Sequence, residues 1–156
     1  MTIMDSRTEM ADAVSVAGTA GTALIGSQIP LSFARDIGNG QPVYLVITCD
    51  TSIITGGAAG TIQFSLASDA TAAIAVDGSA TVHATTELFV TDGDDANALD
   101  AGASIACMAL PLEGVLYEGF LGILAVIATT TVTAGAINAF LTLDPTAWKA
   151  YPEGAN

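Results

Sequence analysis

Hydrophobic and polar side chains alternate along much of the chain, which indicates β-strands. Between positions 61 and 67, the apolar residues Ile62, Phe64 and Leu66 alternate with polar ones. A period of two is that of a strand with one buried face and one face in water. The same alternation predicts a long strand from Ile137 to Leu143. The run from Val43 to Cys49 is apolar throughout and too short for a helix, so it predicts a buried, central strand.

Turn-forming residues separate these runs. Gly38-Asn39-Gly40, the glycine-rich stretch 55–60 and Asp77-Gly78 all favour chain reversal. Asp50 to Ser52 is expected to end the central strand. Residues 72–76 are compatible with either a strand or a helical turn. Further strands are predicted at Ala23–Ile25, Ile29–Ala34, Thr81–Thr85, Leu88–Val90, Ser104–Leu110 and Phe120–Ala128. Many short strands at this spacing are typical of a sandwich or jelly roll.

The two ends of the chain differ from the middle. Residues 1–26 are small and polar, and we predict an extended N-terminal arm there, with a short helix beginning near Thr8 and running to Val16. Residues 27–145 are predicted to form an all-β, jelly-roll-like antiparallel β-sandwich. Residues 146–156 are a short C-terminal tail.

The charge of the chain limits its partners. The net charge is −13, and only three residues are basic. Nucleic-acid binding and adhesion to anionic membranes both need clustered Lys and Arg, so neither is expected. Charged residues make up 12% of the chain, against about 25% in a typical soluble domain. Such a surface is expected where copies of the chain or another protein cover part of it, although a soluble, Ala- and Thr-rich β protein is the alternative.

The basic residues and the tail supply our candidates for partner contact. Aromatic side chains on a tail often anchor in a partner, although packing onto the chain's own domain is an equal alternative. The predicted contacts are Arg7, Arg35, Trp148, Lys149 and Tyr151.

The stretch from Gly119 to Leu143 is uncharged and long enough to span a bilayer. Three features argue against a membrane span: the Thr-rich segment 129–133, a predicted turn at Ala134-Gly135, and the lack of a flanking basic cluster. We therefore predict two strands joined by a Thr-rich connection.

Residues suited to catalysis or metal binding are few. His83 is the only histidine; it is predicted to lie on the same strand face as Thr81 and Thr85, with no G-x-S-x-G motif to supply a nucleophile. Cys49 and Cys107 lie in apolar runs and are expected to be buried thiols, with a disulfide between them as the alternative. No cofactor is expected, and we predict that the protein is not an enzyme.

An acidic loop between positions 91 and 102 has oxygen ligands of the kind that Ca²⁺ binds. It departs from the EF-hand pattern, because Ala96, Asn97 and Ala103 stand where that pattern needs a ligand, Gly and Glu. A solvated loop is the preferred interpretation. The candidate ligands are Asp92, Asp94, Asp95, Asn97 and Asp100.

Four segments resemble a known family. They are DSRTEMADAVSV near the N-terminus, ARDIGNGQPVYLVITCDTSI, GTIQFSLASD, and the closing LPLEGVLYEGFLGILAVIATTTVTAGAINAFLTLDP. Together they resemble the Bbp16-like capsid cement proteins of tailed bacteriophages, from about Asp5 to Pro145. The shared motifs are structural, such as the strand opener Gly40-Gln41-Pro42, and they mark no catalytic residue.

The resemblance implies a jelly-roll fold and a decoration protein on the outer surface of the phage head, made in the host cytoplasm. Its partners would be the major capsid protein and further copies of the chain, as a homodimer or homotrimer. The alternative function is a β-sandwich adhesion or carbohydrate-binding module, with Ca²⁺ held by the acidic loop.

Overall fold

A computed structural model describes residues 7–32, 41–57, 59–92, 99–111, 114 and 116–145. Within these residues the regular structure is β-strand, with no α-helix. The strands are β1 (Glu9–Ser15), β2 (Gly21–Pro30), β3 (Tyr44–Thr55), β4 (Gly60–Asp69), β5 (Thr81–Thr85), β6 (Phe89–Thr91), β7 (Ser104–Ala109), β8 (Phe120–Ala128) and β9 (Val132–Thr142).

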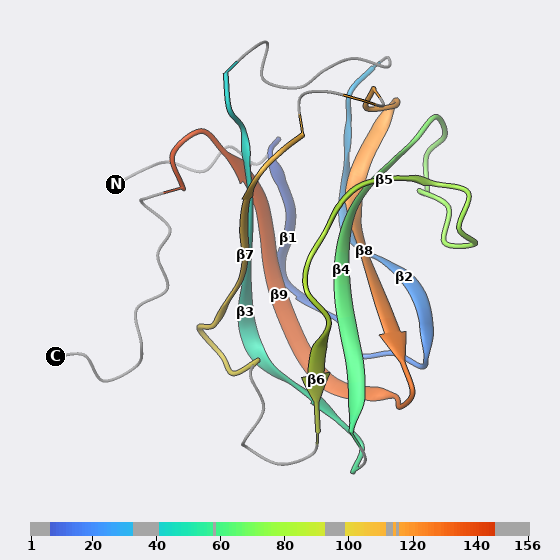
Figure 1. The fold of residues 1–156 in the computed structure, drawn as a ribbon, viewed down its shortest axis with the longest axis vertical. Helices are drawn as coiled ribbons and strands as arrows, with labels where there is room; N and C mark the ends of the chain where they lie inside the picture. Colours follow the sequence, from blue (N-terminus) through green and yellow to red (C-terminus); the bar gives the residue numbers. More distant parts are fainter. Residues whose placement is uncertain are drawn as a thin grey trace, which may run out of the picture.

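The strands form two antiparallel sheets that pack face to face (Figure 1). The first sheet has the order β1-β9-β3-β7, and the second has the order β2-β8-β4-β5, with β6 also paired to β4. The chain is therefore an all-β sandwich, as predicted.

The order of pairing shows how the sandwich is wound. β1 pairs with β9, β2 with β8, β3 with β7, and β4 with both β5 and β6. Each strand of the first half of the chain thus meets its counterpart from the second half, as in one long hairpin. Further pairing of β9 with β3 and of β8 with β4 rolls this hairpin into two sheets. A rolled hairpin in two sheets is the jelly-roll topology.

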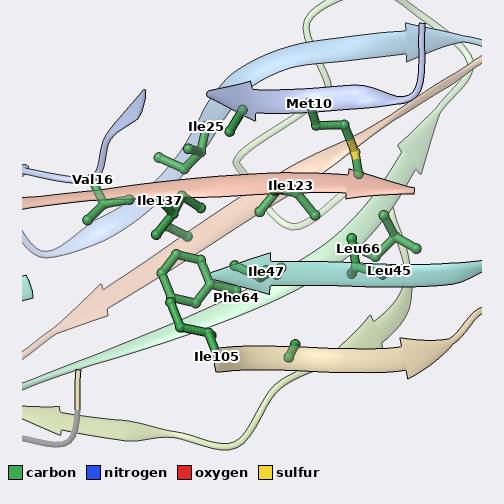
Figure 2. Packing of buried hydrophobic residues seen from close by; sticks show 14 of the residues in the cluster. Met10, Val16, Ile25, Leu45, Ile47, Phe64, Leu66, Ile105, Ile123 and Ile137 are labelled. Carbon is green, nitrogen blue, oxygen red and sulfur yellow. The ribbon is translucent and has the colours of Figure 1, made fainter. Parts of the chain in front are cut away.

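The hydrophobic core fills the space between the sheets. Ile47 and Ile137 from the first sheet and Phe64 and Ile123 from the second are each fully buried there (Figure 2). In each of these strands, the residues that belong to the core recur at every second position. The period of two in the sequence is therefore the period of the core. A separate small cluster of Ala67, Ile74 and Leu124 lies apart from this core.

The N-terminal residues correct our prediction. Residues 9–15 are strand β1 rather than a helix, and residues 21–26 begin β2 rather than extending an arm. The reason is burial: Met10, Ala11 and Val16 are each 1–2% exposed and pack in the core. Small side chains that looked uninformative in the sequence suit a strand that lies close against its neighbours. Residues 1–6 and 146–156 lie outside the described residues, so a terminal arm and tail there stay predictions.

Several predicted boundaries also shift. β3 does not end at Asp50 but continues to Thr55, through register shifts after Cys49 and Thr51. The strand predicted at 23–25 and the first two residues of the strand predicted at 29–34 belong to one strand, β2, which ends at Pro30 and has a register shift between Ile25 and Ile29. Residues 33 and 34 lie outside the described residues. The predicted turn at 134–135 lies inside β9, which begins at Val132. Residues 72–76 are neither strand nor helix.

Other predictions are confirmed. β8 has the predicted bounds Phe120 to Ala128, and β5 the predicted bounds Thr81 to Thr85. The predicted strand at 61–67 lies within β4, and those at 88–90 and 104–110 correspond to β6 and β7 to within one residue.

Among the described residues, no helix is long and apolar enough to cross a membrane.

The two sides of the sandwich close differently. On one side the edge strands β1 and β2 lie against each other. Gly26 of β2 comes so close to β1 that an added Cβ would stand 2.0 Å from the carbonyl oxygen of Met10. On the other side the edges are β7 and the β5–β6 segment, which make no comparable contact. Leu99, Leu110 and Tyr117 are among the buried core residues that lie outside the strands.

Candidate functional site

His83 does not lie where strand alternation predicts. In the pairing of β4 with β5, Leu66 is opposite Ala84 and Ala67 is opposite Val82, so His83 is an extra residue with no partner on β4. One extra residue on one strand is a β-bulge, which re-aims the side chain it carries. The bulge turns the imidazole of His83 away from the face of Thr85 and towards the buried ring of Tyr117.

The imidazole has two close neighbours. Its Nε2 lies 2.7 Å from the hydroxyl oxygen of Ser68, and its ring stacks on Tyr117 with the ring centroids 4.0 Å apart. The Ser68 oxygen also accepts a hydrogen bond of 3.1 Å from the backbone N–H of Glu118. The hydroxyl of Tyr117 donates to the carbonyl of Pro111 at 2.9 Å. These contacts tie the segment before β8 to β4 and β5.

The electrostatics favour the neutral imidazole. Burial lowers the pKa of His83 below its ordinary value, because desolvation penalises the charged ring. A neutral Nε2 without its proton can accept from the Ser68 hydroxyl, which leaves the Ser68 oxygen free to accept from Glu118. Every polar atom of the Ser68 side chain is then satisfied.

Serine beside histidine is the pair that begins a catalytic triad, and our sequence analysis did not predict that Ser68 and His83 would meet. Ser68 is 0% exposed, with the Glu118 amide on its oxygen, so a substrate cannot reach this hydroxyl in the structure. The geometry describes a hydrogen-bonded cluster that joins β4 and β5 to the segment before β8. A β-bulge cannot be read from one sequence, which is why the pair escaped prediction. That the protein is not an enzyme stays a prediction.

The two cysteines have different environments. Cys49 is buried, and its thiol donates to the carbonyl oxygen of Leu99 at 3.3 Å. Desolvation, with smaller contributions from Asp100 and Asp50, raises its pKa to about 11, so this thiol is protonated and unreactive. Cys107 corrects our prediction, because it is exposed on β7, and neither cysteine is in a disulfide.

The acidic loop is described only at its ends. Asp92 and Asp100 are placed, and residues 93–98, which include Asp94, Asp95 and Asn97, lie outside the described residues. Across the part of the chain that the structure describes, no group of three or more His, Cys, Asp and Glu side chains is arranged to hold a metal ion.

The predicted partner contacts are mostly outside the described residues as well. Arg7 is exposed just before β1. Arg35, Trp148, Lys149 and Tyr151 are not among the described residues. Of the five, the structure therefore places one.

Three exposed hydrophobic side chains at the β5–β6 edge of the second sheet were not predicted from the sequence. Val82, Leu88 and Val90 are 52%, 57% and 58% exposed, although each is a large hydrophobic residue. The signal was present in Leu88-Phe89-Val90: three apolar residues in succession cannot all point inward from an extended strand. Phe89 is the one that is buried, so its two neighbours must point outward.

The model of the Bbp16 family matches residues 10–141. The chain belongs to the Bbp16 family. The match runs from β1 to within β9, so the Bbp16 family region includes nearly the whole sandwich. None of the curated proteins matches this Bbp16-family chain.

Proposed function

We propose that this Bbp16-family protein is a capsid cement protein. It binds the outer surface of an assembled bacteriophage head and bridges subunits of the major capsid protein. By doing so it stabilises the shell against the pressure of the packaged DNA. It needs no cofactor, and it reaches the head after synthesis in the host cytoplasm.

The family match over residues 10–141 carries the proposal. The segments that resemble cement proteins of tailed phages include the start of β3, all of β4 and the whole of β8 and β9, so the resemblance lies in the strands that build the sandwich. Nothing in the shared motifs points to a catalytic residue.

The physical properties of the chain suit this role. The first and last strands are paired, so a pulling force on either end of the sandwich acts against a ladder of backbone hydrogen bonds. The net charge of −13 disfavours contact with DNA. A protein on the outside of the head must not bind the packaged DNA, so this charge suits the role. Several copies joined to one another engage several lattice sites at once, so modest contacts add through effective concentration.

The test uses heads that lack the protein. Purified protein is mixed with these heads, unbound protein is removed, and the temperature of DNA release is measured with a dye that binds DNA. We expect saturable binding and release at a higher temperature. Heads that already carry the protein are the control and should bind no more of it. An absence of binding to undecorated heads contradicts the proposal.

Two further measurements separate this function from others. A gel-shift assay with double-stranded DNA should show no complex. Calorimetry with Ca²⁺ and a glycan panel should show no saturable heat; saturable heat there, without binding to heads, would favour the adhesion module instead.

A further inference from the structure

Two large apolar side chains lie on the outer face of the first sheet. Phe140 of β9 and Val46 of β3 are opposite each other in the pairing of these strands. The residues on either side of them, among them Leu45, Ile47 and Leu141, pack in the core. Because side chains alternate along a strand, Phe140 and Val46 point away from the second sheet. Neither of them belongs to a core cluster.

These outer-face residues are nevertheless buried. Val46 is 1% exposed and Phe140 is 4% exposed. The second sheet lies on the other side of the first sheet (Figure 1), and none of the described strands crosses the outer face. Cys107, opposite Val46 on β7, is exposed on the same face. The large ring of Phe140 therefore has a cover that the strands do not provide.

The end of β9 directs the chain towards this face. The side chain of Thr142 points to the outer face, like that of Phe140 two residues earlier. The backbone N–H of Asp144 donates to the Thr142 hydroxyl at 3.1 Å. This bond draws the backbone after β9 towards the outer face. The C-terminal tail, residues 146–156, begins directly after Pro145.

The length of the tail brings an aromatic residue level with Phe140. Asp144 lies four residues after Phe140, about 13 Å along an extended strand, and Trp148 lies four residues after Asp144. A chain that turns back at Asp144 therefore places the indole of Trp148 over Phe140. Aromatic rings bury large apolar areas against each other. Lys149 comes next, and Glu9 is opposite Phe140 on β1, so docking also brings opposite charges together.

The N-terminal residues are a poorer candidate for this cover. The backbone N–H of Leu141 donates to the carbonyl oxygen of Thr8. This bond keeps the chain before β1 in the plane of the sheet, beside β9 rather than above it. Residues 1–6 also contain no aromatic side chain and no Lys.

We infer that the C-terminal tail docks on the outer face of the first sheet of its own chain, with Trp148 against Phe140 and Val46. The tail then covers an apolar patch in the free protein. Of the two alternatives that the sequence left open for the tail aromatics, this is packing onto their own domain rather than anchoring in a partner. Docking of the tail is a property of the free protein, so it goes beyond the proposed function and does not depend on it.

The fluorescence of Trp148 tests this contact, because it is the only tryptophan in the chain. In the folded protein we expect emission at a shorter wavelength than in urea, and weak quenching by acrylamide. Both signals should be the same at about 1 and 200 µM, since the contact lies within one chain. Emission like that of the urea-unfolded protein would overturn the inference. So would a docked signal that is lost on dilution, because the tail would then lie on another copy.

Two matched substitutions locate the docking surface. Phe140→Ala removes the contact, so the emission of Trp148 should move to longer wavelength and its quenching should rise. Phe120→Ala is the control, because Phe120 packs against the small cluster of the second sheet, apart from the core. It should leave both signals unchanged. If Phe140→Ala has no larger effect than Phe120→Ala, Trp148 lies elsewhere and the inference fails.

Deleting each end of the chain in turn separates the two candidate covers without changing the described strands. The chain without residues 146–156 should bind more of the dye ANS than the full chain, because Phe140 and Val46 become exposed. The chain without residues 2–6 should bind no more than the full chain. Circular dichroism establishes that each variant is folded. An increase with the N-terminal deletion alone, or with neither deletion, would contradict docking of the C-terminal tail.

Discussion

The β1–β2 side of the sandwich and the β5–β7 side solve the same problem in different ways. On the first side two backbones come into contact, and Gly26 makes this possible because it has no side chain. On the second side the edges stay apart, and Tyr117, Leu99 and Leu110, all outside the strands, contribute to the core. A jelly roll can thus be closed by its strands or by side chains from its connecting segments. The first solution depends on the backbone, and the second depends on a few large residues and their hydrogen bonds.

The largest expected effect is on the β1–β2 side. Gly26→Ala places a methyl group 2.0 Å from the carbonyl oxygen of Met10, at a residue with φ of 68°. Neither the backbone contact nor the left-handed conformation accommodates a Cβ. We expect the free energy of unfolding to fall by about 4 kcal/mol or more, measured by urea denaturation.

Gly18→Ala is the control for that substitution. Gly18 bridges to Val132, and the nearest atom to an added Cβ is a side-chain carbon of Ile127 at 3.6 Å, which is ordinary contact. The change should stay within about 1 kcal/mol. Equal effects of the two substitutions would mean that β1 and β2 do not touch at Gly26.

On the β5–β7 side, the next largest effect is expected at Tyr117, which is 1% exposed. Tyr117→Ala should cost about 3 kcal/mol in stability, as is usual when a buried aromatic side chain is removed. Tyr117→Phe keeps the ring and loses the hydrogen bond to Pro111, so it should cost about 1 kcal/mol. If Tyr117→Ala were as mild as Tyr117→Phe, the aromatic ring would not be what supports this side.

The smallest expected effect is a dependence on pH through His83. Because burial lowers the pKa of His83, the unfolded state binds a proton at a pH where the folded state does not. Stability therefore rises with pH in that window and is lost as the pH falls below about 6.5. We expect the urea midpoint of the wild-type protein to fall from about pH 7.5 to about pH 5.5, above the range where most carboxylates titrate.

His83→Gln gives the comparison for this pH dependence. Glutamine can still hydrogen-bond Ser68 but does not titrate, so the variant should lose much of the change in midpoint between the two pH values. An equal change in both proteins would mean that His83 titrates in the folded state as it does in the unfolded state.

Much of the fold could be predicted from the sequence, for a physical reason. Residues with one buried face alternate, as in β4, and continuous apolar runs bounded by turns become buried strands, as in β3 and β8. β1 was missed because its inward residues are few and small apart from Met10, so that its pattern is weak. Tertiary contact with β9 makes this segment a strand, and no local signal replaces that contact.

The surroundings of His83 could not be predicted for a related reason. Alternation places His83 beside Thr81 and Thr85, whereas one extra residue in β5 turns it inward to Ser68. A bulge shifts every later side chain to the other face, and only the partner strand reveals it. The exposed Val82, by contrast, follows from the same bulge once the pairing is known.

The rolled-hairpin topology also bears on how the protein is made. Because β1 pairs with β9, the first strand has no partner until the final strand has left the ribosome. Contacts this distant in sequence form slowly, and unpaired strands remain exposed in the meantime. We therefore expect the chain to fold only after its synthesis is complete, which delays attachment to any target until the whole molecule exists.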